Sequence, residues 1–196
     1  MSALTVEPPT AQGHEWDDVV RIWEETDAPD GCTVEIIEGI VTVSPTPANS
    51  HNSLAELVQR RLYTAIPEDW GIYQTLAVEI PSRLGMFIPD LLVAPRAVLN
   101  EPGTCIPAAA AELVVEITSK SNANHDRVEK LHGYATAGVP LYLLLDSWHS
   151  GRPTATLYGE PKNAMYRVLA NVKFGEDITL PAPFDLTIDT STFPVG

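Results

Sequence analysis

The sequence of 196 residues predicts an α/β fold in which a mixed central β-sheet is flanked by helices. Residues 112 to 118 are nearly all apolar and β-branched, as in a strand that is buried on both faces. Apolar residues recur at helical spacing near residues 50 to 65 and 124 to 137, and a strand pattern returns at residues 141 to 146. From residue 50 the predicted order is therefore helix, three strands, helix, strand.

The N-terminal segment predicts a helix and a hairpin that precede this core. Residues 1 to 13 read as a loose tail, so that residues 14 to 196 form a single domain. The apolar positions from Trp16 to Trp23 follow helical spacing, with acidic residues on the other side. Residues 33 to 44 carry β-branched residues around the turn-like pair Glu38-Gly39, which predicts a β-hairpin.

The next helix is expected over residues 50 to 65. Ser53 and Glu56 have the spacing of a capping box, which predicts that they satisfy the free N–H groups at its start. Residues 72 to 80 and 87 to 94 then suit two strands, which we expect in one sheet with the central strand.

The helix over residues 124 to 137 has signals at both ends. Asn124 is the expected N-cap, and Gly138 is the expected left-handed residue after the last turn, with Pro140 just beyond it. The segments TATLYG, AMYRVLA and DITLPAPFDLTI predict late or edge strands.

The charge is strongly acidic. Twelve Lys and Arg stand against 26 Asp and Glu, a formal net charge of −14, and ten of the acidic residues lie in the first 40 positions. This balance excludes a protein that coats nucleic acid electrostatically, so any contact with DNA must be local.

Cys32 and Cys105 are too few and too far apart for a disulfide framework or a zinc site, which predicts free thiols. Without a basic and apolar leader or a long apolar run, the sequence predicts a cytoplasmic protein with no membrane segment.

Two predicted strands each carry one carboxylate in apolar surroundings. Asp90 lies in IPDLLVA and Glu116 interrupts ELVVEIT. A buried charge is costly unless something positive neutralises it, and hard divalent cations bind oxygen ligands. If the strands are neighbours, the two side chains could share one cation. The alternative is that Asp90 is a strand-end residue and Glu116 pairs with a lysine.

Two lysines could complete such a site. Strand alternation places Glu116, Thr118 and Lys120 on one face, whereas Lys130 lies on the following helix with Asp126 one turn earlier. A lysine beside a metal-bound water could orient that water or stabilise charge on a phosphate. A solvated surface lysine is the alternative for each, and Asp126 with Lys130 has the spacing of a simple ion pair.

Other polar and aromatic residues are weaker candidates. His51 begins the helix near residue 50, where a capping or solvated role is as plausible as a functional one. His125, Glu129 and His132 share a helix face, but no second segment matches them as metal ligands. The four tryptophans suit core and lid packing better than base stacking.

Several segments together resemble the Uma2 family of restriction-endonuclease-like proteins, within the PD-(D/E)xK superfamily, over roughly residues 14 to 190. The segments that carry the resemblance are EIIEGIVTVSPTPANSHN, IPDLLVA, ELVVEITS and HDRVEKLHGYATAGVPLYLLLD. None is specific alone, but their order and spacing match. The superfamily core has the order helix, three strands, helix, strand.

The resemblance implies a phosphodiester hydrolase that depends on Mg²⁺ or Mn²⁺ and cleaves DNA. Asp90, Glu116 and the backbone carbonyl of Ile117 would hold the metal, with Glu38 and His51 as accessory positions. The superfamily lysine would fall at Thr118, so the resemblance favours Lys130, with Lys120 as the alternative.

Two other hypotheses stay open at this point. One is a binding or interaction protein that keeps the nuclease fold without catalysis, which the net charge and Thr118 favour. The other is a nuclease that acts only with a basic partner or as a homodimer.

Overall fold

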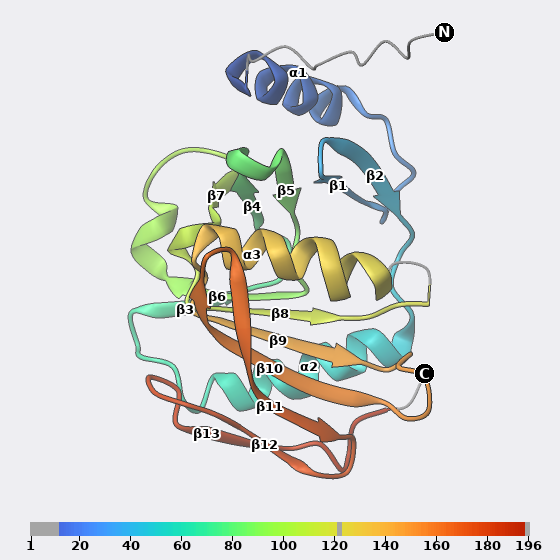
Figure 1. Ribbon diagram of the computed structural model, residues 1–196, viewed down its shortest axis with the longest axis vertical. Helices are drawn as coiled ribbons and strands as arrows, with labels where there is room; N and C mark the ends of the chain where they lie inside the picture. Colours follow the sequence, from blue (N-terminus) through green and yellow to red (C-terminus); the bar gives the residue numbers. More distant parts are fainter. Residues whose placement is uncertain (1–11, 121–122, 195–196) are drawn as a thin grey trace, which may run out of the picture.

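The computed structural model describes residues 12–120 and 123–194 (Figure 1). The predicted tail over residues 1 to 13 lies almost wholly outside the described residues, and its last two positions already belong to helix α1 (Gln12–Glu25). This helix is the one predicted from the spacing of Trp16 to Trp23.

A six-stranded mixed sheet forms the centre of the molecule. Its order is β11-β10-β9-β8-β6-β3. The strands are β3 (Trp70–Tyr73), β6 (Leu91–Pro95), β8 (Leu113–Ile117), β9 (Leu141–Asp146), β10 (Thr154–Lys162) and β11 (Met165–Lys173). Strand β8 lies inside the sheet, antiparallel to β6 and parallel to β9, as its apolar sequence predicts.

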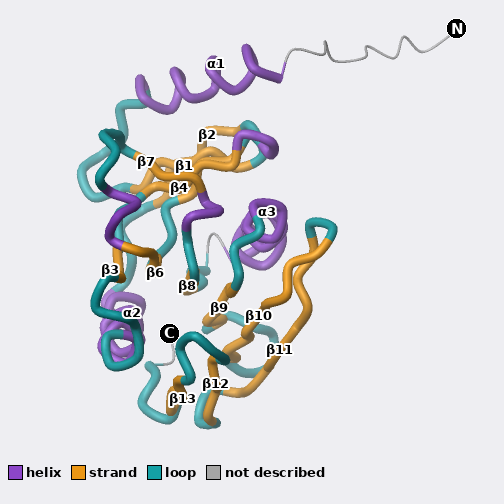
Figure 2. Tube along the Cα trace, turned by 90° about the vertical axis from the view of Figure 1, so that its left-hand side faces the viewer, coloured by secondary structure: helices purple, strands orange, loops and turns teal. Residues whose placement is uncertain are grey.

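Helices cover both faces of this sheet. Helix α2 (Asn49–Leu62) lies on one face with the hairpin of β12 (Asp177–Leu180) and β13 (Leu186–Asp189), and the π-helical turn η4 (His125–Lys130) continues into α3 (Leu131–Ala137) on the other (Figure 2). Alternate residues of β8 point to opposite layers: Val115 joins the core beside α2, and Val114 the core beside α3. Glu116 therefore faces α3.

A second sheet of five strands, in the order β2-β1-β5-β4-β7, lies between α1 and the central sheet (Figure 1). Its strands are β1 (Thr33–Ile37), β2 (Ile40–Ser44), β4 (Ala77–Ile80), β5 (Gly85–Phe87) and β7 (Cys105–Pro107). Short 3₁₀ turns η1 (Pro81–Arg83), η2 (Arg96–Leu99) and η3 (Ala108–Ala110) connect strands.

The second sheet corrects the prediction of one sheet. Residues 72 to 80 are not one strand but parts of β3 and β4, and residues 87 to 94 divide between β5 and β6. Pro89, which has no N–H to donate, and the bend at Asp90 separate the latter pair. Within the central sheet alone, the order α2-β3-β6-β8-α3-β9 is the predicted helix, three strands, helix, strand.

The local end signals are partly confirmed. Glu38 and Gly39 both have positive φ, 51° and 78°, which suits the tight turn of the predicted hairpin. Gly138, with φ 79°, ends α3 as predicted. Asn124, however, is already helical and caps nothing.

The predicted capping box at Ser53 and Glu56 is wrong. The extended segment after Pro47 reaches only to Ala48, and α2 begins at once at Asn49. Ser53 therefore lies inside the helix, and Glu56 pairs instead with Arg60 one turn later.

Candidate active site

Asp90 joins three segments that are distant in the sequence. It stands in the bend before β6, where its Oδ2 accepts the backbone N–H of Ile117 at 2.7 Å. The Nε2 of His51, in the first turn of α2, lies 3.1 Å from the same oxygen. The bend between Pro89 and β6 thus directs the Asp90 carboxylate toward the carboxyl end of β8.

Glu116 is buried on the α3 side of the sheet. Its Oε1 accepts hydrogen bonds from the Lys130 ammonium at 3.1 Å and from the Tyr134 hydroxyl at 2.7 Å. Only 2% of the residue is exposed. The alternation of β8 and the helical spacing of Lys130 and Tyr134 together produce this contact.

Glu35 belongs to the same cluster, although sequence reasoning selected Glu38. Glu35 is buried on β1, lies 2.8 Å from the Lys130 Nζ and accepts the Ile88 N–H at 2.7 Å. Glu38 stands in the exposed hairpin turn and pairs with Arg83, away from this cluster. The signal for Glu35 was present, because a lone carboxylate interrupts the apolar strand TVEII as Glu116 interrupts ELVVEIT.

Lys130 lies at the centre of three carboxylates. Besides Glu35 and Glu116, Asp126 approaches its Nζ to 3.6 Å, and only 3% of the lysine side chain is exposed. Both residues lie in the π-helical turn η4, an irregularity that is frequent at functional sites. The structure thus brings Lys130 to Glu116 and pairs Asp126 with Lys130. Both contacts were among the alternatives that the sequence offered.

The burial of these charges changes their protonation. Burial raises the pKa of Glu116 well above its usual value, the Lys130 ammonium lowers it, and the neighbouring carboxylates raise it further. Burial likewise raises the pKa of Asp126 to about 7. Burial lowers the pKa of Lys130, but the surrounding carboxylates outweigh it and the net shift is well upward, so Lys130 remains an ammonium.

His51 is easier to protonate than an ordinary histidine. Burial lowers its pKa, but the hydrogen bond and charge of Asp90 outweigh this and raise it. A protonated His51 therefore stands beside the Asp90 carboxylate up to a higher pH than an ordinary histidine would allow.

These side chains line a pocket of about 290 Å³ at the carboxyl end of β8. Asp90, Glu116 and the Ile117 backbone offer carboxylate and carbonyl oxygens, which suit a hard cation such as Mg²⁺. Across residues 12–120 and 123–194, no three His, Cys, Asp or Glu side chains form a ligand cluster. Two carboxylates and one carbonyl are fewer ligands than Mg²⁺ needs, and water molecules would supply the rest. Mg²⁺ usually keeps several waters when it binds to a protein. The residues present therefore fit this ion.

Thr118, where the resemblance places the superfamily lysine, takes part in a different network. Its hydroxyl donates to Asp146 at 3.0 Å, and Arg127 donates two hydrogen bonds of 2.8 Å to the same carboxylate. Lys120 lies on the pocket rim with its side chain exposed. Of the two candidate lysines, only Lys130 contacts Glu116.

The other candidates stay apart from the pocket. His125 lies 3.6 Å from Glu129 on the same helix. His125, Glu129 and His132 are all absent from the lining of the pocket.

Cys32 and Cys105 are free thiols, as predicted. No helix in the described part of the chain has the length and apolar character needed to span a membrane.

Comparison with known proteins agrees with this architecture. A crystal structure described as "a putative nuclease belonging to DUF820 from Anabaena variabilis" superposes with a TM-score of 0.68 at 15% identity, covering 89% of this chain and 96% of that one. At this identity the likeness establishes the fold. No curated protein matches the chain significantly.

Residues 16–191 match the family model Uma2, which is described as "Putative restriction endonuclease". The match covers nearly the whole described chain and includes Glu35, Asp90, Glu116, Asp126 and Lys130. The resemblance read from the sequence is thereby confirmed, and the chain belongs to the Uma2 family.

Proposed function

We propose that the chain is a Mg²⁺-dependent endonuclease that hydrolyses phosphodiester bonds in DNA. The observation that carries the proposal is the meeting of Asp90, Glu116 and Lys130, from three separate elements, at one pocket. Two carboxylates beside a permanently charged lysine are the groups that metal-assisted phosphodiester hydrolysis needs. The family and the fold support the same reaction class.

Each residue has a distinct task in this proposal. Asp90, Glu116 and the Ile117 carbonyl would hold the cation, which when bound lowers the pKa of a water and polarises the phosphate. Hydrogen bonds from Ile117 and His51 fix the Asp90 carboxylate in place.

Lys130 supplies a fixed positive charge. Its pKa is raised well above that of a free lysine, so it stays charged and can stabilise negative charge that develops on the phosphate. Glu35, whose Oε1 lies 2.8 Å from the Lys130 Nζ, helps to hold this ammonium in place.

Metal binding tests the carboxylates directly. Calorimetric titration with Mg²⁺ or Mn²⁺ should show heat of binding in the wild type and its loss in Asp90→Ala and Glu116→Ala. Lys120→Ala, on the rim, is the matched control and should bind like the wild type. Unchanged binding in both carboxylate variants would refute the assignment.

Cleavage of supercoiled plasmid DNA with Mg²⁺ tests the lysine. Lys130→Ala should abolish nicking, because the nearest cation at the pocket floor is lost, whereas Lys120→Ala should keep most of it. Thermal unfolding of both variants checks that the fold survives. Inactivity of the wild type with either metal, or a dead Lys120→Ala, would contradict the proposal.

A binding protein without catalysis is the second candidate. The observation that favours it is Thr118, which occupies the superfamily lysine position and is engaged by Asp146. DNA binding that persists with Mg²⁺ while no strand is ever cut would support it.

A further inference from the structure

Trp148 differs from the other tryptophans. Trp16, Trp23 and Trp70 pack against core clusters, as the sequence predicts for all four. Trp148 instead lines the mouth of the pocket in the loop after β9, and 42% of it is exposed. The expectation that it packs in the core or under a lid does not describe this residue.

The loop that carries Trp148 is held by buried polar contacts. The backbone N–H of Trp148 donates a hydrogen bond to the Asp146 carboxylate at 3.1 Å. Only 3% of Asp146 is exposed, and Arg127 donates two hydrogen bonds to its carboxylate. A network of this kind fixes the backbone under an aromatic ring that remains open to solvent.

The pocket suits a narrow ligand. Its volume of about 290 Å³ is at the lower end for small-molecule sites, and two of its carboxylates, those of Glu35 and Glu116, are almost wholly buried. Lys120 stands exposed at the same mouth, where it can meet a phosphate. The mouth therefore offers one aromatic face and one exposed cation.

We propose that Trp148 stacks on an unpaired base, so that this chain acts on single-stranded or locally unpaired nucleic acid. A tryptophan ring can stack only on a base with a free face, and the bases inside a duplex have none. Stacking positions the strand while its phosphate enters the pocket beside Lys130. This inference rests on the proposed nuclease function and adds the substrate class.

Binding of labelled oligonucleotides tests the inference. Fluorescence anisotropy at low ionic strength with Ca²⁺ compares a DNA strand, an RNA strand of the same sequence and the DNA duplex, and gels confirm that all remain intact. The wild type should bind single strands more tightly than the duplex. Trp148→Ala should weaken strand binding about 10-fold, within the range for one stacked base, and Trp148→Phe should restore most of it.

Tyr63 provides the matched control, because it is an aromatic residue, 53% exposed, that does not line the pocket. Tyr63→Ala should bind strands like the wild type. Equal or tighter duplex binding, or wild-type affinity in Trp148→Ala, would overturn the inference.

The two proposals can fail separately. If single strands bind through Trp148 but are not cut with Mg²⁺, the nuclease function fails and the stacking inference stands. If duplex DNA is cut and Trp148→Ala changes no strand affinity, the stacking inference fails alone. Tighter RNA than DNA binding would assign the strand as RNA.

Discussion

Asp126 is the residue whose burial has the clearest pH consequence. Burial raises its pKa to about 7, whereas an unfolded aspartate titrates near about 3.9. The native state therefore holds a proton that the unfolded state loses, so this residue reduces stability as pH rises from about 4 to about 7.

Asp126→Asn should remove that loss. Urea unfolding across this range should show the variant gaining stability relative to the wild type as pH rises, with no further gain above the folded pKa. A difference that stays constant with pH would show that Asp126 does not titrate this way.

Asp146 behaves in the opposite direction. Burial raises its pKa, but the hydrogen bonds from Arg127 and Thr118 outweigh this and hold it below the ordinary value. Its stabilising effect is therefore fully present above the unfolded pKa and disappears as pH falls through the folded pKa.

Asp146→Asn should lower the free energy of unfolding by about 2 kcal/mol at neutral pH, because charged hydrogen bonds are lost. The difference should shrink in acid below about pH 4. Asp177→Asn, at an exposed position of β12, is the control and should change stability by less than about 0.5 kcal/mol.

The contrast between Glu35 and Glu38 shows what a sequence reveals about single residues. Both lie in one hairpin, and the resemblance pointed to the turn residue. Alternation along TVEII separates them only when the buried face is known, and that face is set by contacts with Ile88 and Lys130, far away in the chain. Asp90, Glu116 and Lys130 could be selected from the sequence alone, because each interrupts, or follows, a strongly apolar strand.

At the scale of elements, Gly133 in α3 is a position where tight packing and helix propensity favour different residues. A Cβ at this position would lie 2.6 Å from the Phe87 ring. Gly133→Ala gains about 1 kcal/mol of helix propensity but forces apart two well-packed layers, at a cost of typically 1–3 kcal/mol.

Thermal unfolding should therefore show Gly133→Ala to be no more stable than the wild type, and below it if Phe87 cannot move. Ala137→Gly, at the end of the same helix and partly buried against the core, shows what the loss of one methyl group costs in propensity and packing together. A clear increase in melting temperature for Gly133→Ala would mean that the Phe87 ring moves aside without a loss of stability.

How well each element could be predicted depends on how far apart in the sequence its contacts lie. Long, periodic segments such as α2, β8 and β9 were predicted close to their bounds, because their pattern reports burial directly. The three-residue strands β5 and β7 join the sheet through partners that are distant in the chain, β1 for β5 and β4 for β7, although β5 also pairs with the adjacent β4. No local pattern specifies the distant partners. The second sheet was missed for that reason.

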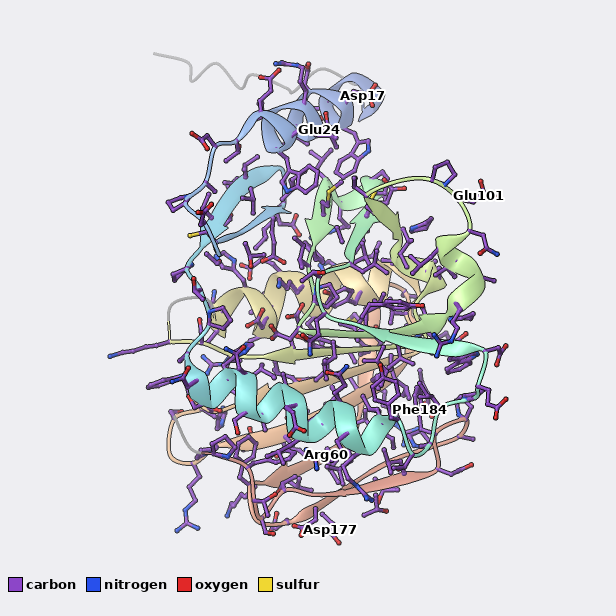
Figure 3. All side chains as sticks on the ribbon, turned by 180° about the vertical axis from the view of Figure 1, so that it is seen from behind. Asp17, Glu24, Arg60, Glu101, Asp177 and Phe184 are labelled. Atoms are coloured by element: carbon purple, nitrogen blue, oxygen red, sulfur yellow. The ribbon has the colours of Figure 1, made fainter. Side chains whose placement is uncertain are left out.

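At the scale of the molecule, α1 is one concentrated source of negative charge, with five acidic residues and one arginine in its 14 residues. Figure 3 shows Asp17 and Glu24 on this helix, at the opposite end from Asp177. Both are exposed, so they shape the long-range potential and contribute little to stability.

Asp17→Asn combined with Glu24→Gln should tighten binding of nucleic acid at low salt. The gain should vanish at about 0.15 M salt, where the Debye length is only about 8 Å. Anisotropy titrations at the two salt concentrations check this, and an equal gain at both would place these acids beside the bound strand.

The pocket draws on β1, α2, the bend before β6, β8, η4 and the loop after β9, so its lining residues are spread from Thr33 to Pro194. A ribosome releases these elements one after another, and no early fragment contains them all. If the chain is the nuclease proposed above, a nascent chain cannot cut nucleic acid until the helix that carries Lys130 has emerged and docked. The order of synthesis itself delays the appearance of the proposed nuclease activity.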